Sequence, residues 1–171
     1  EPVSLDDDAN SGVIVDPLPV QRPHPPIWVA AFGPKALAQA GRLGLPYLAS
    51  PIETLSDLRI NIERHSEAVE QAGHSPVETR PIMRTVFVSE RGDDIAALRK
   101  RLAATKLPTG RKPHAPVDDW AVIGEANYVA DKLAEYKEAL TATHLVVTRL
   151  RLDGVDEPKL RESVARIVEL V

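Results

Sequence analysis

The fold is decided by the stretch Ile27-Trp-Val-Ala-Ala-Phe-Gly-Pro34. Its six apolar residues show no alternation with polar ones, which is typical of a strand whose two faces are both buried in a parallel sheet. The glycine and proline that follow predict a tight turn and the start of a helix that runs to about Leu43. The stretch therefore predicts a strand that leads directly into a helix, the repeating unit of parallel α/β proteins.

The same unit recurs along the chain. Further strands are predicted at residues 47–50, 82–89 and 144–150, and helical spacing of apolar residues predicts helices after each of them, with an extra helix before the last strand. Four strand–helix units favour a parallel sheet with right-handed crossovers. The pattern leaves two architectures open, an open doubly wound sheet and part of a closed barrel.

Two segments lack any periodicity. Residues 1–26, with five prolines in their second half, are predicted to be an extended linker that precedes one domain over residues 27–171. Residues 105–122 are predicted to be a long loop with Arg111, Lys112 and His114 near its centre. Such a loop can close over a bound cofactor, and a surface insertion is the alternative.

Composition excludes several classes of function. The net charge of −4 argues against a nucleic-acid partner, which calls for a basic surface. The chain has no cysteine, which fits a cytoplasmic protein, and no apolar run is long enough to span a membrane. The five histidines are scattered without the spacing of a metal site, so no metal is expected.

Five stretches carry a family resemblance. They are Pro17-Leu-Pro-Val-Gln-Arg-Pro-His-Pro-Pro-Ile-Trp-Val-Ala-Ala-Phe-Gly-Pro-Lys-Ala36, Ala40-Gly-Arg-Leu-Gly-Leu-Pro46, Arg80-Pro-Ile-Met-Arg-Thr-Val-Phe-Val-Ser89, Val122-Ile-Gly-Glu-Ala-Asn-Tyr-Val-Ala-Asp-Lys-Leu133 and Thr143-His-Leu-Val-Val-Thr-Arg149. In this order they resemble the luciferase-like (bacterial luciferase) family of flavin-dependent monooxygenases and oxidoreductases. The sequence departs from the family at Glu125-Ala126, where Ser-Pro is usual.

The resemblance implies a fold and a function. The fold would be the C-terminal half of a TIM (β/α)8 barrel, strands 5–8, and the function an oxidation or monooxygenation of a small organic substrate. The implied cofactor is reduced FMN or coenzyme F420. The expected partner is a missing N-terminal half-barrel or a second copy of the chain, so the chain by itself is expected to be inactive. The alternative is a non-catalytic half-barrel that serves as a binding or assembly module.

The candidate site residues lie where strands end. Phe32, Gly33, Pro34 and Lys35 would hold the cofactor phosphate, because a glycine turn and a helix N-terminus suit an anion; a purely structural turn is the alternative. The predicted substrate residues are Tyr47, Ser50, Arg84 and Arg149. Core packing, or ion pairs of the arginines with Glu90 or Asp153, would be the structural explanation. No catalytic acid or base is predicted, because the cofactor carries the chemistry in such enzymes.

Overall fold

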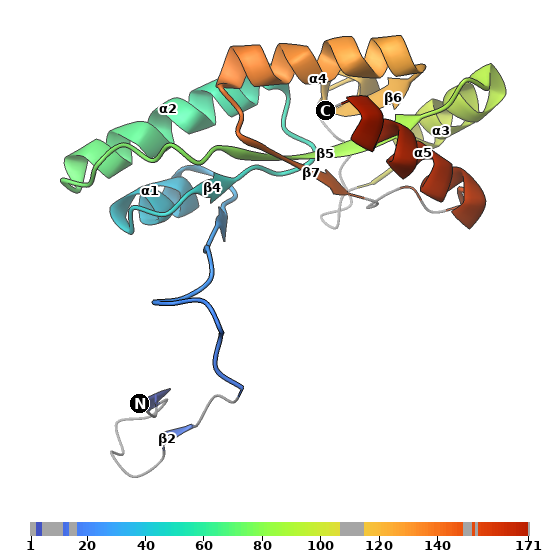
Figure 1. The fold of residues 1–171 in the computed structure, drawn as a ribbon. Coiled ribbons are helices and arrows are strands. Elements are labelled where there is room, and N and C mark those ends of the chain that lie inside the picture. The colour runs from blue at the N-terminus through green and yellow to red at the C-terminus, as the bar shows by residue number, and fades with distance from the viewer. Residues whose placement is uncertain are drawn as a thin grey trace.

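The computed structural model describes residues 3–4, 12–13, 17–106, 115–148, 152 and 154–170. Within these residues five parallel strand–helix units follow one another, from β3–α1 to β7–α5 (Figure 1). The elements are β1 (Val3–Ser4), β2 (Gly12–Val13), β3 (Val29–Ala30), α1 (Pro34–Arg42), β4 (Tyr47–Leu48), α2 (Leu55–Gln71), β5 (Pro81–Val88), α3 (Gly92–Ala104), the short 3-10 helix η1 (Val117–Asp119), β6 (Ala121–Gly124), α4 (Ala126–Leu140), β7 (His144–Thr148) and α5 (Glu157–Leu170).

The predicted linker contains one short antiparallel pairing. Val3 of β1 lies opposite Val13 of β2. Residues 17–26 contain no helix or strand and are mostly exposed. Their prolines lack the backbone N–H group, which disfavours both helix and strand. In Figure 1 the segment that leads to β3 runs away from the helices.

The main sheet is built around β5. All but one of its eight residues are buried. Its second half pairs with β6, from Thr85 opposite Ala121, and its first half pairs with β7, from Pro81 opposite His144. Both pairings are parallel, and the strand order is β6-β5-β7. A second parallel pair, β3–β4, forms its own sheet. The prediction of a parallel α/β protein is therefore confirmed.

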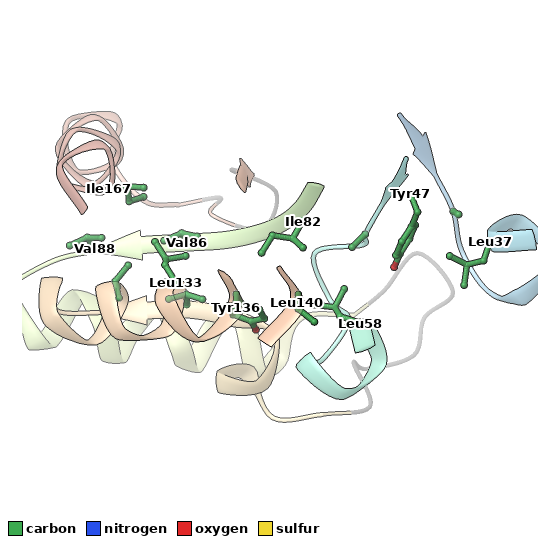
Figure 2. Close-up of a cluster of buried hydrophobic side chains, with 14 residues drawn as sticks. Leu37, Tyr47, Leu58, Ile82, Val86, Val88, Leu133, Tyr136, Leu140 and Ile167 are labelled. Atoms are coloured by element: carbon green, nitrogen blue, oxygen red, sulfur yellow. The ribbon is translucent and has the colours of Figure 1, made fainter. Parts of the chain in front are cut away.

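Helices cover both faces of β5. Side chains alternate between the faces of a strand, and those of β5 divide between two buried clusters. One cluster joins Ile82, Val86 and Val88 to Val129, Leu133, Tyr136 and Leu140 of α4. The other joins Phe87 to Leu98 and Leu102 of α3 and to Trp120, Ala121 and Ile123. Figure 2 shows the α4 side of the strand. The main sheet is thus an open sheet against which α3, α4 and α5 pack.

Close packing of α1 on α2 supports the smaller sheet. A Cβ atom on Gly41 would lie 2.6 Å from the Cβ of Ala68, so only glycine allows this approach of the two helices. The start of α2 is fixed by a capping box: the Asp57 N–H donates to Thr54 Oγ1 (3.1 Å), and the Thr54 N–H donates to Asp57 Oδ2 (3.0 Å). A threonine followed three residues later by an acidic residue is typical of such a cap.

The prediction of one loop over residues 105–122 was wrong at its C-terminal end. There the chain forms η1 and then starts β6, which pairs with β5. Four apolar residues after a proline-rich segment carry too little periodicity to predict a strand, and the pairing with β5 decides the structure. The helix that seemed extra, α4, therefore has its own strand. The loop centre with Arg111, Lys112 and His114 lies outside the described residues.

Candidate functional site at the carboxyl edge of the smaller sheet

Two of the predicted site segments follow neighbouring strands. Val29 lies opposite Tyr47, and Ala30 lies opposite Leu48, in a parallel register. The carboxyl ends of β3 and β4 therefore meet at one edge of this sheet. The Phe32–Lys35 turn and the loop after β4 both begin at that edge, where open α/β sheets bind their ligands.

The turn after β3 is an exposed glycine turn at the N-terminus of a helix. Gly33 has φ 82° and ψ 174°, a conformation that is almost confined to glycine, and a Cβ placed there would meet no atom within 4 Å. Helix α1 begins at Pro34, and the Leu37 N–H donates to the Gly33 carbonyl (3.2 Å). The first turn of α1 contains no acidic residue. Phe32, Gly33, Pro34 and Lys35 are all exposed, so the turn is accessible to a ligand.

Glu53 organises the loop after β4. Its carboxylate accepts hydrogen bonds from the Tyr47 hydroxyl (2.9 and 2.8 Å), the Ser50 N–H (2.6 Å) and the Asn61 amide (2.6 Å). Burial, and next the adjacent Glu53 carboxylate, raise the pKa of the Tyr47 hydroxyl well above its usual range. The tyrosine is therefore a neutral donor that helps to hold the loop in place.

Arg84 of β5 fixes the same loop from the opposite side. The guanidinium is fully buried, and its Nη1 donates to the carbonyls of Ser50 (3.1 Å) and Met83 (2.7 Å). It also lies over the Tyr136 ring, 4.7 Å from the ring centre. Burial lowers the pKa of Arg84, while Tyr136 and Glu53 act in the opposite direction. The N–H of Ser50 is thus held by Glu53 and its carbonyl by Arg84.

The structure brings three of the four predicted substrate residues together. Tyr47, Ser50 and Arg84 form one cluster, but their exposed fractions are only 5%, 6% and 0%. Tyr47 lines a small hollow of about 20 Å³ together with His65 and Ile82. All three residues of the cluster support the loop. Arg149 lies outside the described residues.

Sequence reasoning missed Glu53 and Asn61. Neither stands in a motif, because Glu53 binds Tyr47 across six positions and Asn61 across eight. The only available signal was a glutamate just before the helix cap at Thr54, which capping and solvation would explain equally well.

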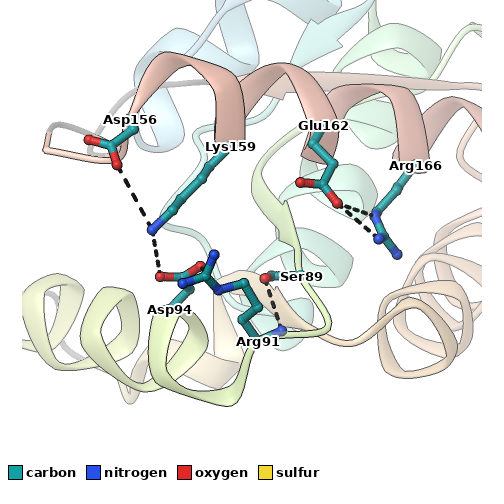
Figure 3. Close-up of polar contacts among 7 residues, drawn as sticks. All are labelled: Ser89, Arg91, Asp94, Asp156, Lys159, Glu162 and Arg166. Carbon is teal, nitrogen blue, oxygen red and sulfur yellow. Dashed lines mark hydrogen bonds and ion pairs between the residues drawn. The ribbon is translucent and has the colours of Figure 1, made fainter.

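The suggested ion pair between Arg84 and Glu90 was wrong. Glu90 pairs with Arg166 of α5 (3.2 Å), which also binds Glu162 (2.9 Å). Asp153, the other acid considered, lies outside the described part of the chain. Figure 3 shows the Arg166–Glu162 pair beside a second set of ion pairs that joins α5 to α3.

These ion pairs hold α5 near the carboxyl end of β5. Lys159 of α5 binds Asp94 of α3 (2.8 Å), and Arg91 lies 3.3 Å from the same carboxylate (Figure 3). The hydrogen bond from Lys159 is the main reason that the pKa of Asp94 is lowered. A hollow of about 590 Å³ lies between α5, β5 and β7, with Val86, Val147, Leu160 and Val164 in its lining.

Neither a metal site nor a membrane helix is found in the described ranges. No group of three or more His, Cys, Asp or Glu side chains there is placed to hold a metal ion. No helix there has the length and apolar character needed to cross a bilayer.

The fold and this edge define a parallel α/β protein with an accessible glycine turn at the end of a strand. Residues 8–116 match the luciferase-like monooxygenase family, and the chain belongs to that family. No curated protein matches the chain.

Solved structures share the fold at low sequence identity. Monooxygenase RslO1 from Streptomyces bottropensis matches with a TM-score of 0.64 at 16% identity, over 88% of this chain and 48% of its own. The oxygenating constituent of 3,6-diketocamphane monooxygenase from the CAM plasmid of Pseudomonas putida, in complex with FMN, matches with a TM-score of 0.58 at 20% identity, over 84% and 47%. An F420-dependent secondary alcohol dehydrogenase matches with a TM-score of 0.55 at 17% identity, over 83% and 48%. The chain spans about half the length of these enzymes.

Proposed function

We propose that this chain supplies the cofactor-phosphate turn and one wall of the substrate site of a luciferase-like oxidoreductase that uses reduced FMN or coenzyme F420. The observation that carries the proposal is the accessible Gly33 turn beside the braced loop after β4, at one edge of the β3–β4 pair. The solved relatives in complex with FMN and with F420 support both cofactors.

The residues of the turn fit a phosphate group. The N–H groups of Lys35 and Ala36 belong to the first turn of α1, where helical N–H groups point toward an anion, and the Lys35 ammonium adds a positive charge. A reduced flavin or F420, when bound, supplies two electrons to a substrate or to oxygen. The protein's own part is to bind this group, orient it and exclude water.

The loop after β4, which Glu53 and Arg84 hold in place, would face the substrate. Glu53 and Arg84 fix both backbone groups of Ser50, so Tyr47, Ser50 and Arg84 would act by keeping that wall rigid. Arg149 stays a predicted substrate residue from the sequence alone. The remaining contacts would come from a missing half-barrel or from a second copy of the chain, and the substrate would be a small organic molecule. The absence of cysteine supports a cytoplasmic location.

The test compares FMN with riboflavin, which lacks the phosphate. We expect the full chain to bind FMN with at least about fivefold higher affinity than riboflavin, equivalent to about 1 kcal/mol for an anion at a helix N-terminus. Gly33→Ala is expected to abolish the difference and Gly92→Ala to preserve it, because Gly92 also stands in open space but has no positive φ. Equal affinity for the two flavins would refute the phosphate assignment.

A second candidate function is a non-catalytic binding or assembly module. It is favoured by the burial of β5 on both faces, which gives the chain a core of its own. Light scattering with and without FMN separates the two functions. A dimer that retains FMN supports the enzyme, and a dimer without FMN supports the module. A flavin-free monomer of 18.7 kDa fits a module as well as a fragment that needs its missing half.

A further inference from the structure

Phe32 places an aromatic ring in water beside the glycine turn. Its side chain is 73% exposed, and no other aromatic side chain among the described residues is exposed. The chain has only two phenylalanines, and the other, Phe87, lies in the core. A single exposed apolar side chain is common on a protein surface, so the neighbours of Phe32 decide what it can contact.

Burial alternates along the chain from β3 into the turn. Ala31 is buried in the cluster that includes Leu37 of α1 and Leu58 of α2. Ala30 and Phe32, on either side of it, are exposed. Because side chains alternate between the two faces of an extended chain, Ala30 and Phe32 share the face that is turned away from these helices.

Leu48 of β4 extends this face. It lies opposite Ala30 in the parallel register of β3 and β4, so the two side chains project from the same face of the pair. Leu48 is partly exposed, whereas its neighbours Tyr47 and Ala49 are buried. Ala30 carries only a methyl group, so a flat ligand can come close to the backbone there.

We propose that Ala30, Phe32 and Leu48 form a ring platform on which the flat ring system of the cofactor lies, with Phe32 as its aromatic contact. This inference rests on the proposed function, because FMN and F420 each join a flat tricyclic ring to a phosphate through a flexible chain. The proposed phosphate turn begins one residue after Phe32, and a Cβ atom on Gly33 would meet no atom within 4 Å. A ligand whose phosphate lies at the turn can therefore reach the platform with its ring.

The ring platform suits a flat aromatic ligand. Offset-stacked or edge-to-face contact with a phenylalanine stabilises an aromatic ring beyond the free energy of its burial. None of the three side chains carries a charge or a hydrogen-bonding group, so the platform selects by shape. The turn and the platform thus recognise the two ends of the cofactor separately, the phosphate by its charge and the ring by stacking.

Two flavins separate the ring contact from the phosphate contact. We expect Phe32→Ala to weaken the binding of FMN and of riboflavin by the same factor, at least about fivefold, because both carry the ring. Gly33→Ala should weaken the binding of FMN alone. Ile27→Ala is the matched control and should change neither affinity, because Ile27 is also an exposed apolar residue (46%) but precedes β3. Fluorescence titration of the full chain measures each affinity.

A tryptophan at the same position gives a readout other than affinity. We expect Phe32→Trp to retain the affinity for riboflavin and to quench the fluorescence of the bound flavin, because an indole in contact with a flavin is an efficient quencher. Ile27→Trp should leave the fluorescence of the bound flavin as it is in the natural chain.

The outcomes distinguish the ring platform from the phosphate turn. If Phe32→Ala binds riboflavin as tightly as the natural chain does, while FMN still binds more tightly than riboflavin, the platform is refuted and the turn stands. If the two flavins bind equally and both lose affinity in Phe32→Ala, the turn is refuted and the platform stands. If the full chain binds neither flavin, both are refuted.

Discussion

The sheet around β5 and the β3–β4 pair are both built from strand–helix units, but they differ in strand length and in burial. The first has an eight-residue strand with helices on both faces, whereas the second has two strands of two residues each and an exposed turn. Phe87 of the first is 1% exposed, and Phe32 of the second is 73% exposed. The comparison indicates that one sheet holds most of the buried core, while the other carries the proposed binding edge.

The loop after β4 joins the two regions. Arg84 extends from the middle of β5 to the Ser50 carbonyl, and Glu53 holds the Ser50 N–H from the loop itself. The proposed binding edge is therefore tied to the stable sheet by the buried Arg84. Rigid supports of this kind are what a functional site requires.

The largest expected effect is the difference in stability between a variant at Phe87 and a variant at Phe32. Phe87→Ala should lower the free energy of unfolding by about 3–5 kcal/mol, because it leaves a cavity between β5 and α3. Phe32→Ala should change it by less than about 0.5 kcal/mol, because its side chain is mostly in water. Urea denaturation of both variants measures the difference, and similar losses would remove the division into a stable sheet and a binding edge.

A smaller effect is expected at the turn. Gly33→Ala should cost about 1–3 kcal/mol of stability, because alanine does not readily adopt φ 82° with ψ 174°. Gly92→Ala is the matched control, since it adds the same methyl group in open space on a helix. Thermal unfolding of the pair measures the cost. Equal stabilities would show that the turn relaxes to accept a side chain.

Alkaline pH should weaken the support of the loop. Burial raises the pKa of Tyr47 and that of Tyr136 above the ordinary tyrosine value, so the folded chain retains protons that the unfolded chain releases. Each tyrosine therefore contributes stability that is fully present below about pH 10 and is lost as the pH rises toward its raised pKa. Tyr47→Phe should reduce this loss in urea titrations, and an unchanged loss would contradict the assignment.

The smallest expected effect concerns Lys35. Lys35→Gln should leave the melting temperature unchanged and weaken FMN binding by about threefold, because the side chain is exposed and adds one charge near the turn. Arg161→Gln, in an exposed pair with Glu157 on α5, controls for a general change of charge. A similar loss of affinity in both variants would remove Lys35 from the proposed phosphate site.

The sequence by itself determined the repeating unit and the place of the turn. The unbroken apolar run before Gly33 and the largely apolar run after Arg80 predict buried parallel strands, and Gly-Pro after a strand predicts the turn. These are local preferences of backbone and side chain. The capping box at Thr54 was predictable for the same reason.

Only the tertiary structure decided the rest. The four residues of β6 become a strand because β5 offers them an edge, and the order β6-β5-β7 depends on which edges and faces the helices cover. The cluster of Tyr47, Glu53 and Arg84 joins residues from two strands and a loop. Such contacts between distant residues leave no periodic signal, because they arise from packing and not from the local chain.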